Sequence, residues 1–158
     1  ELARIRLEDR LRAAPGAAVW VLLGAADGGQ AVRGRLLDSG PDWLLVGRGE
    51  SGVETLIPLA AISALTGLPA GASEPGSEGH VRSRLGLAHV LRGIARDRAT
   101  VVLALRGGIL TGTIDRVGAD YLDLAEHASE DPCRPHSVRA MRTVPFGAVL
   151  FVQRAGIG

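Results

Sequence analysis

The chain contains an internal repeat. Residues 29–46 align without a gap with residues 107–124. The alignment pairs glycine with glycine, aspartate with aspartate and one aromatic residue with another: Gly34 with Gly112, Gly40 with Gly118, Asp42 with Asp120 and Trp43 with Tyr121. Because these unusual features keep one spacing in both stretches, we expect two copies of a single fold unit.

The residues around the aligned stretches predict strands. Val19, Val21 and Leu23 alternate with other residues, as Val101 and Leu103 do. A period of two is typical of a strand with one buried face. Downstream, residues 57–62 resemble residues 144–149, and both segments have proline in second position. Proline is tolerated at strand starts, edges and corners, so each proline is predicted to mark a corner before a short last strand.

A helix is predicted before each copy. Apolar residues recur at helical spacing over 2–11 and 87–94, with arginine and acidic residues between them. Residues 68–80 are rich in Gly, Pro, Ser and Glu, which is typical of a flexible linker. We therefore expect a first unit at 1–67, a linker at 68–80 and a second unit at 81–158.

Glycines shape the predicted unit. Gly34 and Gly112 lie in the middle of strands, where the lack of a side chain permits a sharp bend. Gly40 and Gly118 lie in turns, where glycine can take positive φ. The predicted fold class is mainly β with α. Each of two tandem units would have an N-terminal helix and a strongly bent, five-stranded antiparallel open barrel.

This order of elements resembles the Sm-like fold of the Sm, LSm and Hfq proteins, here as a tandem duplication in a single bacterial chain. The resemblance rests on two sets of residues: Gly29, Val32, Gly34, Leu36, Asp42, Leu44 and Val46, and Gly107, Leu110, Gly112, Ile114, Asp120, Leu122 and Leu124. Such proteins usually form rings in which the last strand of one protomer pairs with the fourth strand of the next. The resemblance therefore implies a homo-oligomer through exposed strand edges, such as a dimer or a trimer of chains, with one edge satisfied inside the chain. The alternative is a monomer in which the helices or the linker cap these edges.

The resemblance also implies RNA binding near the turn before the third strand and near the last corner. Asp42, Trp43, Asp120 and Tyr121 occupy the turn, and the two aromatic rings are either base-stacking platforms or packed core residues. The corners read Pro58-Leu59-Ala60 and Pro145-Phe146-Gly147. They lack the Tyr-Lys-His of Hfq and the Arg-Gly of eukaryotic Sm proteins, so the ligand can equally be a protein.

Charge favours a local rather than a general attraction to nucleic acid. All 18 basic residues are Arg, yet the formal net charge is only +1. Arg92, Arg96 and Arg98 lie in or just after the second predicted helix, where guanidinium groups are either phosphate ligands or a solvated helix face. No helix-turn-helix pattern is visible, although a DNA-associated transcriptional regulator is kept as an alternative.

One segment carries metal-ligating residue types. His127, Cys133 and His136 fall within residues 126–137, and a Cys-x-x-His spacing with a further His is a weak zinc candidate. An exposed polar insertion explains the same residues. No acid/base pair, nucleophile with an orienting group or phosphate loop is found, so we predict no catalytic residue and no cofactor.

The remaining expectations follow from composition. A single cysteine fits a reducing compartment, so a cytoplasmic location is predicted. No apolar run near the length of a membrane span and no signal peptide is evident. The sequence thus predicts a non-enzymatic Sm-like binding and assembly module, and the resemblance implies that it binds RNA or acts as an RNA-associated regulator. The alternative is a protein interaction scaffold that binds no nucleic acid.

Overall fold

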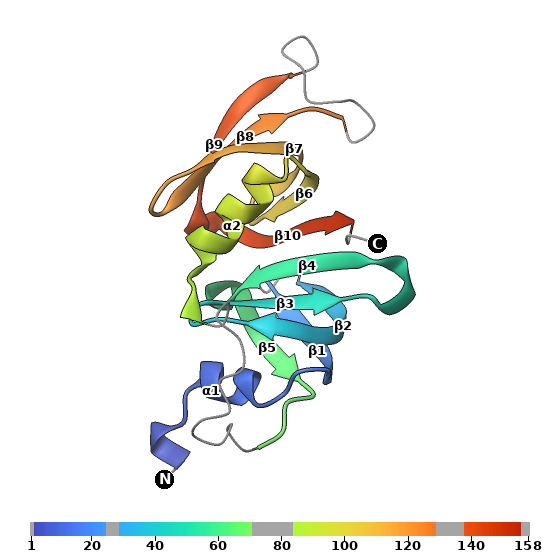
Figure 1. Cartoon of the computed structure of the whole chain (residues 1–158), viewed down its shortest axis with the longest axis vertical. Coiled ribbons are helices and arrows are strands. Elements are labelled where there is room, and N and C mark those ends of the chain that lie inside the picture. Colours follow the sequence, from blue (N-terminus) through green and yellow to red (C-terminus); the bar gives the residue numbers. More distant parts are fainter. Residues whose placement is uncertain (1, 25–28, 71–83, 129–137, 156–158) are drawn as a thin grey trace.

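The computed structural model describes residues 2–24, 29–70, 84–128 and 138–155, and in it ten strands form one antiparallel sheet (Figure 1). The strand order is β5-β1-β2-β3-β4-β10-β6-β7-β8-β9, and the sheet does not close into a barrel. The strands are β1 (Ala18–Leu23), β2 (Gln30–Ser39), β3 (Trp43–Gly47), β4 (Val53–Pro58), β5 (Ile62–Thr66), β6 (Thr100–Leu105), β7 (Gly108–Val117), β8 (Tyr121–Glu126), β9 (Ala140–Pro145) and β10 (Val149–Ala155). We call residues 2–70 the first half and residues 84–155 the second half.

The two halves share one strand order. The first half runs β5-β1-β2-β3-β4, and the second half runs β10-β6-β7-β8-β9 in the corresponding positions. The last strand of the second half, β10, pairs with the fourth strand of the first half, β4. The expectation that one edge is satisfied inside the chain is therefore confirmed. The ten strands nevertheless make a single continuous sheet rather than two separate ones.

The register of the strands repeats as well. Val19 pairs with Gly34 in the first half, and Val101 pairs with Gly112 in the second. The pairings of β2 with β3 and of β7 with β8 each contain one irregular step, at Leu36/Asp38 and at Ile114/Arg116. The repeat recognised in the sequence is thus a repeat of backbone pairing.

The turns and corners repeat in the same way. Backbone N–H groups of Gly40 and Gly118 donate to the carbonyls of Trp43 and Tyr121, at 2.9 and 2.8 Å. Pro58 and Pro145 end β4 and β9, and each is followed by a 3-10 turn, Leu59–Ala61 in the first half and Phe146–Ala148 in the second. The two prolines therefore mark corners, as expected.

The role expected of Gly40 and Gly118 is wrong in one respect. Neither residue has positive φ. A Cβ on Gly40 would collide with the indole of Trp43, and a Cβ on Gly118 would collide with the ring of Tyr121. The turn requires glycine because an aromatic ring lies directly against its Cα, so the constraint is close approach rather than a left-handed backbone.

The first helix is shorter than its sequence pattern suggests. A 3-10 turn spans Leu2–Arg4, and α1 spans only Leu7–Arg12. The Asp9 carboxylate accepts the backbone N–H of Arg6 at 2.8 Å, which caps a new helix start at that point. The second helix, α2, spans Leu87–Arg96 as its apolar spacing predicts. No helix in the described ranges is long and apolar enough to cross a membrane.

Two apolar clusters form the core, and each takes residues from both halves. The first cluster consists mainly of first-half side chains but includes Ala104, Leu150 and Phe151. The second consists mainly of second-half side chains but includes Trp43 and Leu56. The clusters therefore interlock on either side of the β4–β10 pairing, where β10 runs beside β4 in the middle of the molecule (Figure 1).

Candidate functional site

The internal junction, defined here as the β4–β10 pairing with the contacts of α2 on the first half, shows how two of these units join. Leu56 lies opposite Val152, and Thr55 lies opposite Gln153. The side-chain amide of Gln153 donates to the Thr55 hydroxyl at 3.3 Å. Strand pairing satisfies the N–H and C=O groups that an edge strand would leave unpaired. One edge of each half is therefore satisfied here.

An arginine ties three elements together at the internal junction. Arg154 on β10 lies 3.6 Å from a carboxylate oxygen of Glu54 on β4. Its other terminal nitrogen lies 3.2 Å from a carboxylate oxygen of Asp97, just after α2. The side chains of Arg154 and Glu54 are both largely covered, so their pair is screened less than an ordinary surface pair, whereas the Asp97 side chain is 54% exposed.

The start of α2 rests on the turn between β2 and β3 of the first half. The Asp42 carboxylate accepts the backbone N–H of Leu87 at 2.9 Å. The indole N–H of Trp43 donates to the carbonyl of Leu85 at 2.7 Å. One half thus caps and holds the helix of the other through the turn that both halves share, Gly-x-Asp followed by an aromatic residue.

These contacts give Asp42 and Trp43 structural roles. Trp43 is 0% exposed, so its ring presents no face to a nucleobase. Trp43 is therefore a packed core residue and not a base-stacking platform, which were the two interpretations that the sequence allowed. Asp42 is an exposed residue whose carboxylate is engaged as a helix cap.

The equivalent positions at the far ends of the molecule are uncovered. Tyr121 is 38% exposed, whereas its counterpart Trp43 is buried beneath α2. Leu7, the first residue of α1, is 39% exposed, whereas Leu87, the first residue of α2, is only 5% exposed. Asp120 is also exposed. The internal junction therefore buries Leu87 and Trp43, and their repeat counterparts, Leu7 and Tyr121, are exposed at the two ends of the molecule.

The sheet edges lie at the same two ends. Strands β5 and β9 terminate the strand order, and neither has a second strand partner among the described residues. Met141 on β9 is 54% exposed, although it is a large apolar side chain. Leu7 and Arg10 of α1 line a hollow together with β5. An open strand edge beside exposed apolar groups is typical of an association surface.

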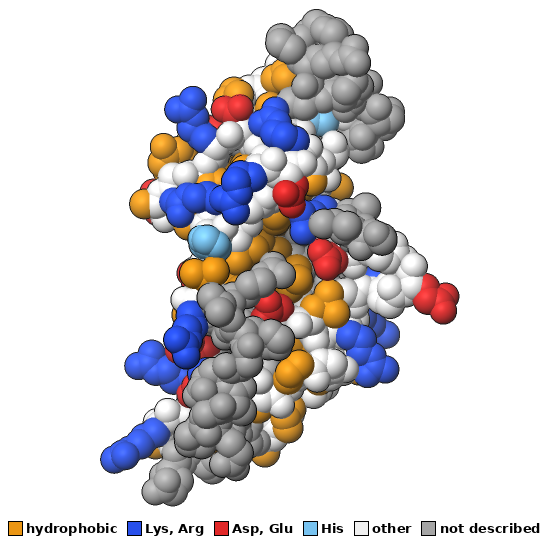
Figure 2. All heavy atoms as spheres, in the orientation of Figure 1, with side chains coloured by type: hydrophobic (Ala, Val, Ile, Leu, Met, Phe, Trp, Pro, Cys, Tyr) orange, Lys and Arg blue, Asp and Glu red, His pale blue; other side chains and the backbone are white. Residues whose placement is uncertain are grey.

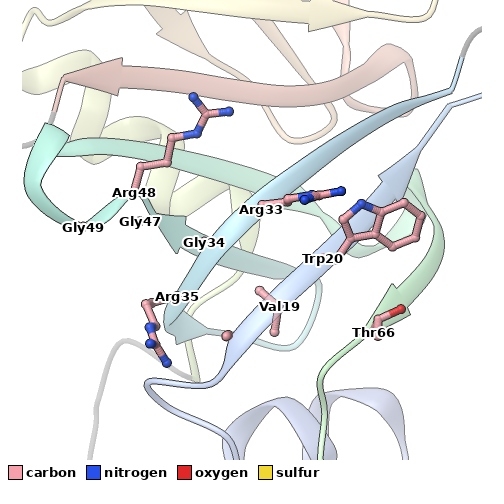
Figure 3. Close-up of a pocket in the computed structure, with 10 residues that line it drawn as sticks. Val19, Trp20, Arg33, Gly34, Arg35, Gly47, Arg48, Gly49 and Thr66 are labelled. Atoms are coloured by element: carbon pink, nitrogen blue, oxygen red, sulfur yellow. The ribbon is translucent and has the colours of Figure 1, made fainter.

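A second feature is an open hollow of about 720 Å³ in the first half (Figure 3). It is lined by Ala18, Val19, Trp20, Arg33, Gly34, Arg35, Gly47, Arg48, Gly49 and Thr66. Alternate residues of β1 are buried in the core, so Trp20 belongs to the opposite, outer face of the sheet. Trp20 lies across from Arg33 on β2 and from Thr66 on β5.

The hollow is basic. Arg33 extends toward the indole of Trp20, while Arg48 rises from the end of β3 (Figure 3). Arg35 points away from both, and its guanidinium donates to the Gly16 carbonyl at 3.1 Å. The guanidinium groups of Arg33 and Arg48 have no hydrogen-bond or ion-pair partner among the described residues. The lining includes no carboxylate.

The helix arginines singled out in the sequence lie on a mixed surface. Arg92 is exposed and donates to the Gly118 carbonyl at 3.3 Å, while Arg96 is exposed. Arg98 lies 4.0 Å from the Asp115 carboxylate. Figure 2 shows basic side chains with acidic ones among them on the face that carries α2. This arrangement favours the solvated-face interpretation of these arginines.

His127 is not arranged as a zinc ligand. It is 1% exposed, its Nδ1 lies 2.7 Å from the carbonyl of Ala128, and its Nε2 lies 2.7 Å from Oγ1 of Thr113. A carbonyl only accepts, so Nδ1 carries a hydrogen, and in the neutral imidazole Nε2 then accepts from the Thr113 hydroxyl. Both ring nitrogens are therefore occupied. Cys133 and His136 lie outside the described residues, within which no group of three or more His, Cys, Asp or Glu residues could hold a metal.

Several residues that matter here were not singled out in the sequence. Leu7 and Met141 look like ordinary members of an amphipathic pattern, and their exposure depends on which neighbour is present. Trp20, Arg33 and Arg48 differ from their repeat counterparts, and a position-by-position comparison of the two copies would have found them. No protein-family model matches the chain, and no curated protein matches it.

Proposed function

We propose that the chain is a non-enzymatic assembly module made of two tandem Sm-like units, and that copies associate head to tail. The observation that carries this proposal is the match between what the internal junction buries and what the chain ends leave exposed. The shared strand order of the two halves supports the same view. The partner is a second copy of the chain, because its β5 end is built like the β10 side of the internal junction.

The internal junction supplies a template for the contact between chains. Its register, transferred by the repeat, sets Leu65 on β5 of one chain opposite Thr143 on β9 of the next, just as Val152 lies opposite Leu56. Thr66 then faces Arg142. The ladder would continue without a break, which removes two unpaired strand edges for every contact.

The helix contact follows the same template. Leu7 of one chain would cover Tyr121 of the next, as Leu87 and Trp43 come together in the second core cluster. The backbone N–H of Leu7 is one of the amides at a helix start that lack a partner within the helix. The Asp120 carboxylate of the neighbouring chain would accept it, as Asp42 accepts the N–H of Leu87.

The contact is heterologous, since one end of the chain meets the other end of its neighbour. Such contacts build closed rings when the rotation between copies closes and filaments when it does not. Size-exclusion chromatography with light scattering on the wild-type chain tests the proposal first. We expect an assembly whose mass is an integral multiple of the chain mass. A monomer at all concentrations up to the millimolar range contradicts the proposal.

A complementation experiment tests the polarity of the contact. Leu7→Asp places a charge at one end and Tyr121→Asp places a charge at the other, so each variant alone is expected to be monomeric. Mixed one to one, the two variants retain one intact end each and are expected to form a heterodimer and nothing larger. If Leu7→Asp alone still dimerises, the β9 ends pair with each other and the head-to-tail arrangement is wrong.

The matched control is Ile109→Asp. Ile109 is 62% exposed, which is more than either end residue, but it lies in the β6–β7 hairpin away from both sheet edges. We expect this variant to assemble as the wild type does. Loss of assembly in Ile109→Asp would assign association to general surface hydrophobicity instead of to the two ends.

A further inference from the structure

The open hollow lined by Trp20, Arg33, Arg35 and Arg48, called the Trp20 hollow from here on, has a composition that the fold itself does not require. The strand register places residues of the second half in positions equivalent to the hollow: Val102 for Trp20, Thr111 for Arg33, Thr113 for Arg35 and Glu126 for Arg48. The same backbone therefore accepts small, neutral or acidic side chains there. The aromatic ring and three positive charges are particular to the first half, which points to a role other than folding.

The residue types restrict the ligand. A half-buried indole on the outer face offers an apolar plane, and the guanidinium groups around it attract anions. Two of those groups have no partner among the described residues, so no carboxylate in that part of the chain competes with a bound anion. A base stacked on an aromatic ring with its phosphates on arginines is the usual combination in single-strand binding sites. The hollow is therefore suited to a nucleotide.

The spread of the arginines favours a strand over a single nucleotide. Arg33 and Arg35 lie two residues apart on β2, about 6.6–6.8 Å along the strand, while Arg48 belongs to a neighbouring strand end. They point in different directions around the hollow (Figure 3). Convergent arginines would hold one phosphate, whereas diverging ones suit successive phosphates of an extended backbone.

We propose that the Trp20 hollow binds single-stranded nucleic acid, with one base stacked on Trp20 and backbone phosphates on Arg33 and Arg48. Arg35, which also holds the Gly16 carbonyl, flanks the path. This site lies on the outer face of β1 and β2 and involves neither the corner residues nor the β2–β3 turn. Single-stranded nucleic acid would thus be a ligand of the proposed assembly module. The site is complete within one chain, so binding does not require assembly.

The test uses fluorescence anisotropy with labelled oligouridine RNA of about 12 nucleotides, a length within the site sizes of known single-strand binders. Trp20→Ala is expected to weaken binding about 5- to 140-fold, because stacking contributes about 1–3 kcal/mol per base and 1.4 kcal/mol is tenfold. Trp20→Phe is expected to recover a large part of that loss.

The arginines are tested through salt dependence. On single strands, the slope of log affinity against log salt falls by about 0.7 for each phosphate contact removed. Arg33→Gln and Arg48→Gln are each expected to lower the slope by about that amount, and together by about twice as much. The matched control is Arg92→Gln with Arg96→Gln on α2, which is expected to leave both affinity and slope near wild type.

Three further probes distinguish a single-stranded nucleic acid from a free nucleotide and from a polyanion without bases. Oligothymidine of equal length is expected to bind within about tenfold of the RNA, because stacking is tolerant of sequence and sugar. Uridine monophosphate is expected to bind far more weakly than the oligomer. Heparin is expected to compete, but its own binding is expected not to change in Trp20→Ala.

Specific results overturn the proposal. They are absence of oligonucleotide binding by the wild-type chain, full binding by Trp20→Ala, and loss of binding in the α2 variant with none in Arg33→Gln. Binding of the mononucleotide as tight as that of the oligomer would also overturn it. The monomeric Tyr121→Asp variant separates this question from assembly: it is expected to bind RNA through one hollow per chain. If the chain does not assemble, the proposal of a nucleic-acid site is unaffected. If the hollow does not bind RNA, the proposal of head-to-tail assembly is unaffected.

Discussion

The Asp42 carboxylate accepts the backbone N–H of Leu87 at 2.9 Å, across 45 residues of chain and from one half of the molecule to the other. A negative charge at this position also complements the positive end of the helix dipole. The contact fixes where α2 begins, because the N-cap residue itself, Gly86, has no side chain that could do so. Asp120 has the same place in the second half.

Asp42→Ala is predicted to destabilise the chain by about 1 kcal/mol, which is the usual effect of removing a helix cap. Chemical denaturation followed by circular dichroism measures it. Asp120→Ala is the matched control, since the described contacts of its half contain no helix for it to cap. A monomeric background such as Tyr121→Asp keeps assembly out of the comparison. Equal destabilisation by both substitutions would contradict the capping role.

The Thr113 hydroxyl and His127 form a buried pair that gives a second prediction. Thr113→Val keeps the shape of the side chain but leaves Nε2 of His127 without its donor in a site where Thr113 and His127 are each 1% exposed. The loss is predicted at about 1–3 kcal/mol, the usual penalty for a buried polar group left unsatisfied. Thr111→Val, two residues earlier on the same strand, is predicted to change the free energy of unfolding by less than about 0.5 kcal/mol.

The sequence predicted the strand pattern because its causes are local. Alternation of apolar residues on β1 and β6, and the proline corners, depend on neighbours within a few residues. The repeat then fixed the correspondence between the halves. The pairing of a final strand with a fourth strand was expected from the resemblance to Sm-like proteins, and it agrees with the general tendency of open sheet edges to pair.

The sequence could not predict which neighbour covers each repeated surface. Trp43 and Tyr121 are equivalent in sequence and in backbone, yet one is buried and the other is not, because among the described residues only Trp43 is followed by a helix that covers it. Burial at these positions is decided by long-range contacts, which a periodic pattern does not encode. The apolar pattern over residues 2–11 did not reveal that α1 starts at Leu7, because that start is set by the local contact of the Asp9 carboxylate with the backbone N–H of Arg6.

The close approach of aromatic rings to the turn glycines gives a third prediction. Gly40→Ala places a Cβ against the fully buried Trp43 indole, which has no room to move. We expect a loss of about 1–3 kcal/mol, as for other overpacked core sites. Gly118→Ala should be milder, because the partly exposed ring of Tyr121 can swing toward solvent. Gly147→Ala is the control, since a Cβ there meets no atom within 4 Å; thermal melts in one buffer compare all three.

The interlocked core clusters predict that the first half depends on the second. A fragment of residues 1–70 lacks the side chains that pack on Trp43 and Leu56, and its β4 edge is unpaired. Each large apolar side chain contributes about 1.5–3 kcal/mol when buried, so the fragment loses several kcal/mol and gains an edge prone to aggregation. In a Trp20→Phe background, Trp43 is the single tryptophan that reports on this surface.

We expect red-shifted, quencher-accessible Trp43 emission and self-association for the fragment, and blue-shifted, protected emission for the full chain. Adding a fragment of residues 84–158 should restore protection, because it supplies both β10 and α2. The same addition with Arg154→Glu should restore it less well, since the new carboxylate would face Glu54 and Asp97. A monomeric first-half fragment with protected Trp43 would show that the two clusters are independent, and the internal junction could then no longer serve as a template for contacts between chains.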